Sequence, residues 1–346
     1  MLRLVFIVIA LNLCANVFIN ATLTPKSKKS TKNHDRITAK SGPHNLTVFD
    51  RNLVTMSTSP KDILQNYKAF FKETDEYSFK GLVLGYVTPW NNHGYDIGKI
   101  FGNKFTHISP VWLELRRKSP KAYEIKGTHD VDKDWMAHVR NAGRERHIKI
   151  VPRLLFGGLT GDDFNDIFHS SKEIKALIKA IIHNAKNYDF DGFVLEIWPQ
   201  FEVEIEYDPL LNLVKAIGDA LAVDGLDMIL VIPPKRGHNI PFTEAHFNKL
   251  YKHVTAFSLM TYDYSNPRKP GPNAPLSWVE DCIRSVCTDE KKRAKILTGL
   301  NFYGNHYHEH GGKPIVAHEY IKILEENGHG KLMYDAQIAE HYLEFE

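Results

Sequence analysis

Cysteine is scarce in this sequence of 346 residues, which contains only three. So few cysteines exclude the dense disulfide framework of small secreted domains. Cys14 lies in an N-terminal apolar segment, so Cys282 and Cys287 are the two that concern the folded chain. Their spacing fits no zinc motif and leaves two readings open, a local disulfide or two separate buried thiols.

Strong net charge and long apolar runs are also missing. The formal net charge is +3, which is too small to favour a nucleic-acid partner. No apolar run approaches the ~20 residues that a membrane-spanning helix needs. We therefore expect no nucleic-acid partner and no membrane span. The remaining composition, 43% hydrophobic and 25% charged, is that of a globular protein with a sizeable core.

The N-terminus has the pattern of a secretory signal peptide. Arg3 is followed by the apolar run 4–13, and the small residues Ala15 and Ala21 come next. A charge, a short apolar core and small residues are the three parts of such a signal. We predict a signal peptide over residues 1–21 and a secreted protein, with the lysosome as an alternative destination.

Two further segments follow the predicted signal. Residues 22–61 are rich in Lys, Ser and Thr and are expected to form a polar linker. Residues 62–346 are expected to form the folded domain. Of two glycosylation sequons, at Asn20 and Asn45, we favour Asn45, because Asn20 lies in or beside the predicted signal.

Short apolar runs alternate with longer helical patterns from residue 62 onward. The helical segment 170–188, for example, places Ile174, Leu177 and Ile181 on one face. This alternation predicts a parallel sheet and, with seven strands, a (β/α)8 TIM barrel. No Gly-x-Gly-x-x-Gly follows the first run, which argues against a dinucleotide-binding fold. The predicted strands are Gly81–Val87, Lys104–Trp112, Ile148–Phe156, Phe190–Trp198, Asp227–Pro233, Val254–Tyr262 and Lys295–Tyr303.

The final strand of the barrel is missing from this count. A closed barrel of this type needs eight strands, and an open one would expose two unpaired edges. We therefore expect either a shortened product, from a truncated gene model or a splice form, or an unusual closing element.

Functional residues of such barrels lie where the strands end at their carboxyl side. Here those positions combine aromatic rings with acid and amide groups, a mixture that suits a carbohydrate, because sugar rings stack on Trp and Tyr and sugar hydroxyls need polar partners. The alternative is that several of the rings belong to the core. The candidate saccharide-binding residues are Trp90, Trp112, Glu196, Trp198, Met260, Tyr262, Asp263, Tyr264, Asn301 and Tyr303.

Six segments together carry a resemblance to a known family: "GYVTPWNNHGYD", "HISPVW", "FDGFVLEIW", "FSLMTYDYS", "PGPNAPLSW" and "ILTGLNFYG". They resemble glycoside hydrolase family 18, the chitinase family, and within it a chitinase-like branch. The resemblance covers most of residues 81–346 and implies a TIM barrel that binds chitooligosaccharides. In the family the last strand ends in a Trp that lines the sugar site, so the chain departs from the family there.

The family carries Asp-x-Asp-x-Glu on its fourth strand, with the Glu as general acid. Alignment on "FDG" places Glu196 at the middle Asp position and Trp198 at the acid position. Strand alternation then predicts that Val194, Glu196 and Trp198 point into the barrel, while Phe193, Leu195 and Ile197 face the helices. The family acid lies two residues farther along the strand than Glu196, a distance of about 6.6 Å. The side chain of a Glu is only one methylene longer than that of the Asp found there in the family, so Glu196 is not expected to replace the acid.

The resemblance also implies that Tyr262 and Asp263 hold a substrate N-acetyl group and that Met260 lines the sugar. With the acid missing, we expect a carbohydrate-binding protein that does not hydrolyse its ligand. The alternatives are a weak or altered glycosidase and an interaction or signalling factor with a vestigial groove. The expected partners are chitooligosaccharide-like sugars, with an endocytic or sorting receptor as a further candidate.

Three other features of the sequence allow both a functional and a purely structural interpretation. Glu202 or Glu204 would be a substitute acid only if their loop folded over the mouth. The alternating histidines of residues 306–310 resemble a metal-binding cluster, but such clusters occur by chance in a chain with 18 histidines. The basic stretch Lys235–Asn239 would meet an anionic sugar or remain a solvated loop. We predict no metal and no cofactor.

Overall fold

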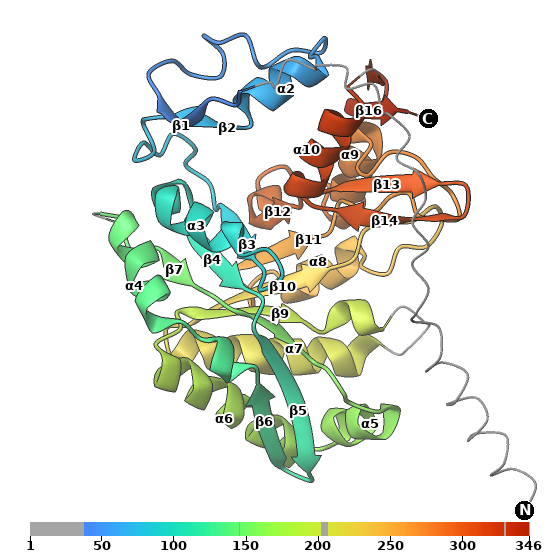
Figure 1. Cartoon of the computed structure of the whole chain (residues 1–346). Helices are drawn as coiled ribbons and strands as arrows, with labels where there is room; N and C mark the ends of the chain where they lie inside the picture. The colour runs from blue at the N-terminus through green and yellow to red at the C-terminus, as the bar shows by residue number, and fades with distance from the viewer. Residues whose placement is uncertain (1–37, 145, 202–206, 329, 346) are drawn as a thin grey trace, which may run out of the picture. The chain divides into compact units, whose positions relative to one another are not determined.

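The computed structural model describes residues 38–144, 146–201, 207–328 and 330–345 (Figure 1). The predicted signal peptide, the sequon at Asn20 and the first part of the predicted linker lie outside these ranges. Residues Ala39–Glu346 form one unit. Within the described ranges, no helix combines the length and the apolar character that a membrane crossing requires.

The central parallel strands lie inside the seven predicted runs. The third run is divided into β7 and β8, with Pro152, which has no N–H to donate, between them. The strands pair in chain order, so β3 and β12 lie at the two ends of the series. They are β3 (Leu84–Val87), β4 (His107–Pro110), β7 (Lys149–Ile150), β8 (Arg153–Leu155), β9 (Gly192–Glu196), β10 (Asp227–Ile232), β11 (Ala256–Leu259) and β12 (Ile296–Thr298). Among the described residues, no eighth parallel strand follows β12.

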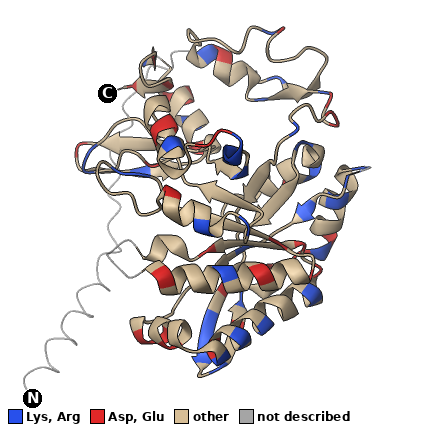
Figure 2. Ribbon diagram, turned by 180° about the vertical axis from the view of Figure 1, so that it is seen from behind, with Lys and Arg blue, Asp and Glu red and all other residues tan. Residues whose placement is uncertain are grey.

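Helices lie between these strands, as the alternating pattern predicts. The longest, α6, begins after Ser170, whose side chain accepts a hydrogen bond from the Glu173 N–H, and ends at Asp189, which is left-handed at φ 58°. Figure 2 shows both signs of charge spread along these helices. They are α3 (His93–Ile100), α4 (Lys133–Ala142), α5 (Gly161–His169), α6 (Ser171–Tyr188), α7 (Tyr207–Val223), α8 (Glu244–Leu250) and α9 (Leu276–Val286).

Two apolar clusters hold the sheet from its two sides. The larger lies between sheet and helices and includes Phe193, Leu195 and Ile197, as predicted. The smaller is made of side chains on the opposite face of the strands, such as Val194 and Ile229, which fill the barrel interior. The alternation along β9 therefore follows the prediction as far as Glu196. Cys282 and Cys287 are both buried and free, so of the two readings this structure has the separate thiols.

Several hairpins were not predicted. The second strand continues into β5, which pairs with β8 on one side and with β6 on the other. After β12 come two more hairpins with a helix between them. These elements are β5 (Leu113–Ser119), β6 (Ala122–Lys126), β13 (Gly304–His308), β14 (Gly311–Ile315), α10 (Ala317–Glu326), β15 (Lys331–Asp335) and β16 (Glu340–Glu344).

The segment before the barrel is also structured. Strands β1 (Ser41–His44) and β2 (Lys68–Phe71) pair in parallel, and α2 (Pro60–Asn66) connects them. Leu64 of α2 packs against Ile321 and Leu324 of α10. The stretch that composition identifies as linker thus includes β1 and the start of α2. Short 3₁₀ turns complete the fold at Gly102–Lys104, Thr128–Asp130, Trp198–Gln200 and Lys292–Lys295.

A polar cluster joins four strands at the amino ends of the sheet. Asp227, at the start of β10, accepts hydrogen bonds from His107 (2.9 Å), Lys149 (2.6 Å) and Thr255 (3.1 Å). Burial alone would raise the pKa of Asp227, but the hydrogen bonds from His107 and Lys149 outweigh it and lower the pKa to about 2. The cluster lies far along the strands from the predicted mouth, which indicates a role in stability.

This cluster predicts a loss of stability in acid. The folded pKa of Asp227 lies below its ordinary value of 3.8, so its contribution is present above about pH 4 and is lost as pH falls toward about 2. The loss should amount to about 2 kcal/mol. Urea unfolding of the wild type and of Asp227→Asn across this range measures it. The difference between the two proteins should shrink as pH falls, and a constant difference would contradict the assignment.

Candidate functional site

Tyr262 and Asp263, directly after β11, line a pocket of about 210 Å³ where β10 and β11 end. Asp263 has a left-handed backbone (φ 58°), and its carboxylate accepts a 2.6 Å hydrogen bond from the Tyr303 hydroxyl. The predicted residues Met260, Tyr262, Asp263 and Tyr303 are therefore close together. The pocket is lined by Pro233, Pro234, Arg236, Asn239, Pro241, Met260, Tyr262 and Asp263.

The two tyrosines can donate hydrogen bonds at neutral pH. Burial first, and then the negative charges of Glu196 and Asp263, raise the pKa of Tyr262 to about 12. Burial and the hydrogen bond to Asp263 also raise the pKa of Tyr303 above its ordinary value. Their rings meet edge to face with centroids 6.2 Å apart. The site thus offers the Tyr262 hydroxyl as a donor and the Asp263 carboxylate and Tyr303 oxygen as acceptors, which are complementary to the hydroxyl and amide groups of an N-acetylated sugar.

Glu196 ends β9 and points into the barrel, as predicted. Its carboxylate accepts a 3.0 Å hydrogen bond from Arg153 of β8 in an ion pair whose side chains are 26% and 22% exposed. Nearby, the Tyr86 hydroxyl of β3 and the Ser258 hydroxyl of β11 lie 2.8 Å apart, across the barrel interior. The floor of the mouth is therefore polar and contains the ion pair of Glu196 and Arg153.

Trp198 does not point into the barrel, so that prediction was wrong. Strand β9 ends at Glu196, and Ile197 leaves the extended conformation (φ −120°, ψ −43°), which breaks the alternation of the strand. Trp198 is completely buried in the helix-facing cluster. It stacks on Tyr207 at 5.3 Å between centroids and donates a hydrogen bond to the Pro241 carbonyl (3.0 Å). A ring with no exposed face cannot stack on a sugar.

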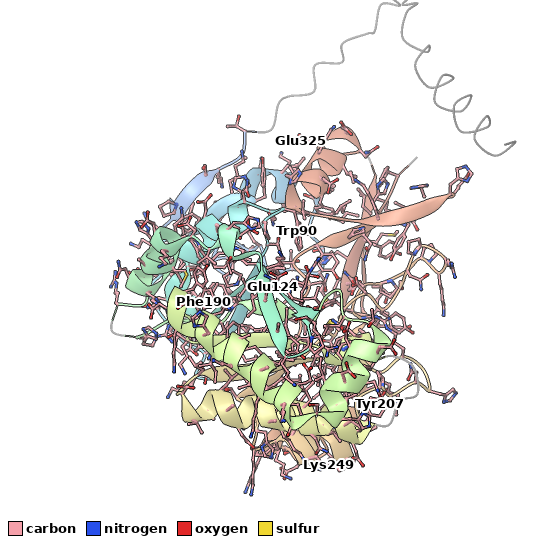
Figure 3. All side chains as sticks on the ribbon, turned by 90° about the horizontal axis from the view of Figure 1, so that it is seen from below. Trp90, Glu124, Phe190, Tyr207, Lys249 and Glu325 are labelled. Atoms are coloured by element: carbon pink, nitrogen blue, oxygen red, sulfur yellow. The ribbon has the colours of Figure 1, made fainter. Side chains whose placement is uncertain are left out.

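None of the remaining candidates lines the pocket. Trp112 is only 6% exposed and donates a hydrogen bond to the Tyr95 hydroxyl, so it belongs to the helix-facing core. Trp90, labelled in Figure 3, follows β3 and is 72% exposed. Tyr264 packs on Trp278, and Asn301 donates to the Tyr303 carbonyl, which stabilises the turn after β12. Of the three rings, Trp90 at 72% exposed is the most open, Tyr264 is 43% exposed and Trp112 is buried.

Two arginines belong to the site: Arg153, which was not predicted, and Arg236, which lies in the basic stretch 235–239 that the sequence singled out. Arg153 is a charged residue within an otherwise apolar run, and that is the signal by which the sequence could have identified it. Arg236 lines the pocket and donates a 2.7 Å hydrogen bond to the Asp263 carbonyl, while its neighbour Lys235 pairs with Asp281. The basic stretch 235–239 therefore reaches the mouth, where it supports Asp263.

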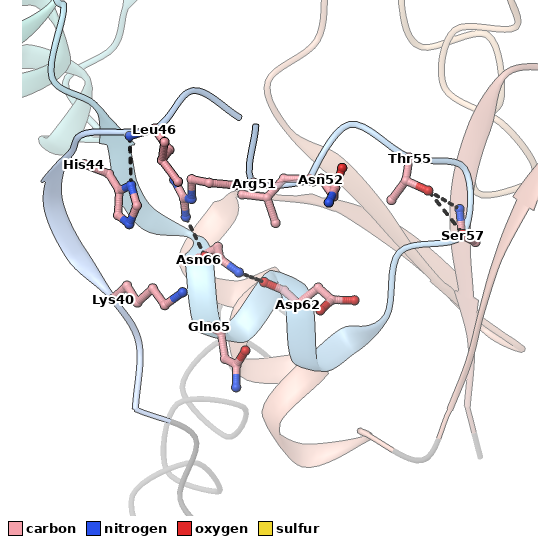
Figure 4. Close-up of a pocket in the computed structure, with 11 residues that line it drawn as sticks. Lys40, His44, Leu46, Arg51, Asn52, Thr55, Ser57, Asp62, Gln65 and Asn66 are labelled. Carbon is pink, nitrogen blue, oxygen red and sulfur yellow. Dashed lines mark hydrogen bonds between the residues drawn. The ribbon is translucent and has the colours of Figure 1, made fainter. Parts of the chain in front are cut away.

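A larger hollow of about 510 Å³ lies around α2, in the segment that precedes the barrel (Figure 4). Lys40, His44 and Arg51 line it, and Arg51 donates a hydrogen bond to Asn66. None of the predicted sugar-binding residues lines it. Its size does not make it the site, because the convergent acid, amide and phenol groups are at the strand ends.

Two alternatives from the sequence receive no support here. Glu202 and Glu204 lie outside the described residues. His306 and His308 lie on β13 with ring centroids 6.2 Å apart, but the described ranges contain no group of three or more His, Cys, Asp or Glu side chains arranged to hold a metal ion.

Comparison with known proteins agrees with the fold. Residues 82–343 match the family model described as Glycosyl hydrolases family 18. The structure is similar to a chitinase from Chromobacterium violaceum (17% identity, TM-score 0.60, covering 76% of this chain and 81% of that one). It is also similar to a class V chitinase from Pseudomonas fluorescens (19% identity, TM-score 0.60, covering 76% of this chain and 80% of that one). A third similar structure is a mutant GH18 chitinase from Cycas revoluta in complex with (GlcNAc)4 (16% identity, TM-score 0.59, covering 76% of this chain and 85% of that one). At sequence identities this low, the structural similarity establishes the fold alone. That fold is the predicted (β/α)8 type.

Proposed function

The chain belongs to glycosyl hydrolases family 18, and from this premise we propose that it binds chitooligosaccharides or related N-acetylated glycans without hydrolysing them. Family membership confirms the coarser part of the sequence-based resemblance. The observation that carries the proposal is the group formed by Tyr262, Asp263 and Tyr303 at the strand ends. The Cycas relative was solved with (GlcNAc)4, which supports the choice of ligand class.

The chemistry at the end of β9 supports the proposed absence of hydrolysis. Glycoside hydrolysis in this family needs a carboxylic acid that protonates the leaving oxygen, a step that contributes roughly 10²–10⁴-fold to the rate. Glu196 is the described acid on this strand that faces the mouth, and its carboxylate is engaged by Arg153 of β8. Trp198, at the position of the family acid, is buried and has no proton of suitable acidity.

The biological setting is part of the same proposal. The signal peptide pattern supports entry into the secretory pathway, with secretion or delivery to the lysosome, and an endocytic or sorting receptor would be a partner. Asn45, which is exposed directly after β1, is the proposed glycosylation site. Within the family we assign the chain to the chitinase-like branch that chitinase domain-containing protein 1 represents, because the quoted segments resemble it.

Isothermal calorimetry with chitotetraose tests the proposal. We expect saturable heat, and we expect Asp263→Asn to weaken the affinity roughly 10- to 100-fold, since a hydrogen bond to a charged group contributes about 1.5–3 kcal/mol. Asparagine tolerates the left-handed backbone of Asp263, so the variant should fold. The exposed Glu325 of α10 (Figure 3), changed to Gln, is the control and should bind normally.

Two other results would replace the proposal. Heat that continues after each injection, together with released N-acetylglucosamine oligomers, would identify a weak or altered glycosidase. No heat from a protein that circular dichroism shows to be folded would favour an interaction or signalling factor with a vestigial groove.

A further inference from the structure

Asp263 has a backbone conformation that needs support from its surroundings. A left-handed non-glycine residue costs of order 1–3 kcal/mol unless neighbouring groups determine it. Here the Asp263 N–H donates a 2.6 Å hydrogen bond to the Asn273 side-chain oxygen, and its carbonyl accepts one from Arg236. Its orientation therefore depends on Asn273, which lies ten residues away.

The loop that carries Asn273 has few hydrogen bonds of its own. Residues 264–275 include Pro267, Pro270, Pro272 and Pro275, none of which has an N–H to donate. Within the loop, Tyr264 donates to the Asn273 carbonyl (2.9 Å), and Asn266 and Lys269 form a small bridge. A segment of this kind needs an anchor outside itself to fix the position of Asn273.

Glu340, the first residue of β16, provides that anchor. Its carboxylate accepts hydrogen bonds from two consecutive backbone N–H groups, that of Asn273 (2.9 Å) and that of Ala274. The Leu276 N–H donates to the Ile338 carbonyl (3.1 Å) beside it. Both oxygens of one charged group thus fix two adjacent residues of the loop, and charge-assisted bonds of this kind are roughly twice as strong as neutral ones.

We propose that Glu340 is a positioning residue of the glycan site, which holds Asp263 in its left-handed conformation through Asn273. Glu340 does not line the pocket, so it acts on a ligand only through this chain of hydrogen bonds. The C-terminal hairpin β15–β16 is thereby part of the sugar site. The effect on affinity rests on the proposed function, whereas the effect on the loop does not.

Glu340→Gln tests the proposal because it replaces one acceptor oxygen with an NH2 group, which donates but cannot accept. We expect the backbone amides of Asp263, Tyr264, Asn273 and Ala274 to exchange faster with deuterium, and the affinity for chitotetraose to fall about tenfold, or roughly 1.4 kcal/mol. Glu344→Gln, an exposed acid on the same strand, is the matched control and should change neither. If Glu340→Gln does not fold, Asn273→Ala replaces it as the test. This variant removes the side chain that links Glu340 to Asp263 and should produce the same faster exchange and weaker binding.

A thermodynamic cycle separates positioning from general destabilisation. If Glu340 acts through Asp263, then Glu340→Gln should have no further effect on affinity in the Asp263→Asn background, whereas a general effect would add to it. Additive losses, or unchanged amide exchange at Asp263 and Asn273, would overturn the proposal. If the wild type binds no sugar, the proposed function fails, and amide exchange alone decides whether Glu340 holds the loop.

Discussion

Replacing Trp198 with glutamate is expected to give a protein that hydrolyses no chitotetraose and loses at least about 3 kcal/mol of unfolding free energy. By alignment, this substitution restores the family acid. In the structure, however, position 198 lies behind the end of β9, where the ring is stacked on Tyr207 and packed edge-on against Phe242 at 4.8 Å. A glutamate there would leave a cavity and bury a carboxylate among apolar groups.

The measurements are urea unfolding and an assay for released N-acetylglucosamine oligomers. Trp90→Glu is the matched control, because it makes the same exchange at a ring that is 72% exposed and should change stability by no more than about 0.5 kcal/mol. A Trp198→Glu protein of normal stability that cleaves chitotetraose would show that position 198 faces the sugar after all. Loss of stability without activity would identify Trp198 as a core residue, not a substituted catalyst.

The strands could be predicted because the central ones, β4, β9, β10 and β11, are buried on both faces. Such strands appear in the sequence as short apolar runs, and every predicted run contains an observed strand. The same reasoning fixed which side of β9 faces the helices. It failed two residues later, because alternation holds only while the backbone is extended, and Ile197 leaves that conformation just before the turn that contains Pro199.

The site was predictable where one strand end supplies neighbouring groups. Met260, Tyr262 and Asp263 come from one segment, and their proximity follows from the strand itself. The partners that complete the site come from elsewhere in the chain. Glu340 lies 67 residues beyond Asn273, and nothing in its own segment distinguishes it from the other acids of the C-terminal region. Contacts of this kind depend on how loops meet in space, which periodicity does not specify.

The unpredicted hairpin β5–β6 leads to the second prediction. Glu114 of β5 is level with Leu155 of β8, which in turn is level with Glu196, so the hairpin begins beside the mouth and extends away from it. Arg117 fastens it to α5 and α6 through Asp163 (2.8 Å) and Glu173 (2.9 Å). The side chains of Arg117 and Glu173 are 7% and 4% exposed, so this is a buried ion pair.

Arg117→Met is therefore expected to destabilise the protein by about 3 kcal/mol, because it leaves Glu173 buried without its cation. The value lies at the low end of the range for broken buried pairs, since the Tyr123 hydroxyl and the Lys121 N–H still donate to Glu173. Arg116→Met is the matched control, because Arg116 is the preceding residue on the strand and its side chain, paired with Glu114, is 49% exposed. That variant should lose no more than about 1 kcal/mol.

The pH dependence of this loss distinguishes a broken ion pair from lost packing. Burial raises the pKa of Glu173, but the hydrogen bonds from Tyr123 and Arg117 outweigh it, so the pKa in the wild type is lowered. Its stabilising contribution is then present above its ordinary value of 4.5 and is lost as pH falls below it. The difference in unfolding free energy between wild type and Arg117→Met should therefore shrink in acid. A difference that stays constant with pH would mean that the arginine acts through its apolar stem, and that the hairpin is fastened beside the mouth by packing instead of by charge.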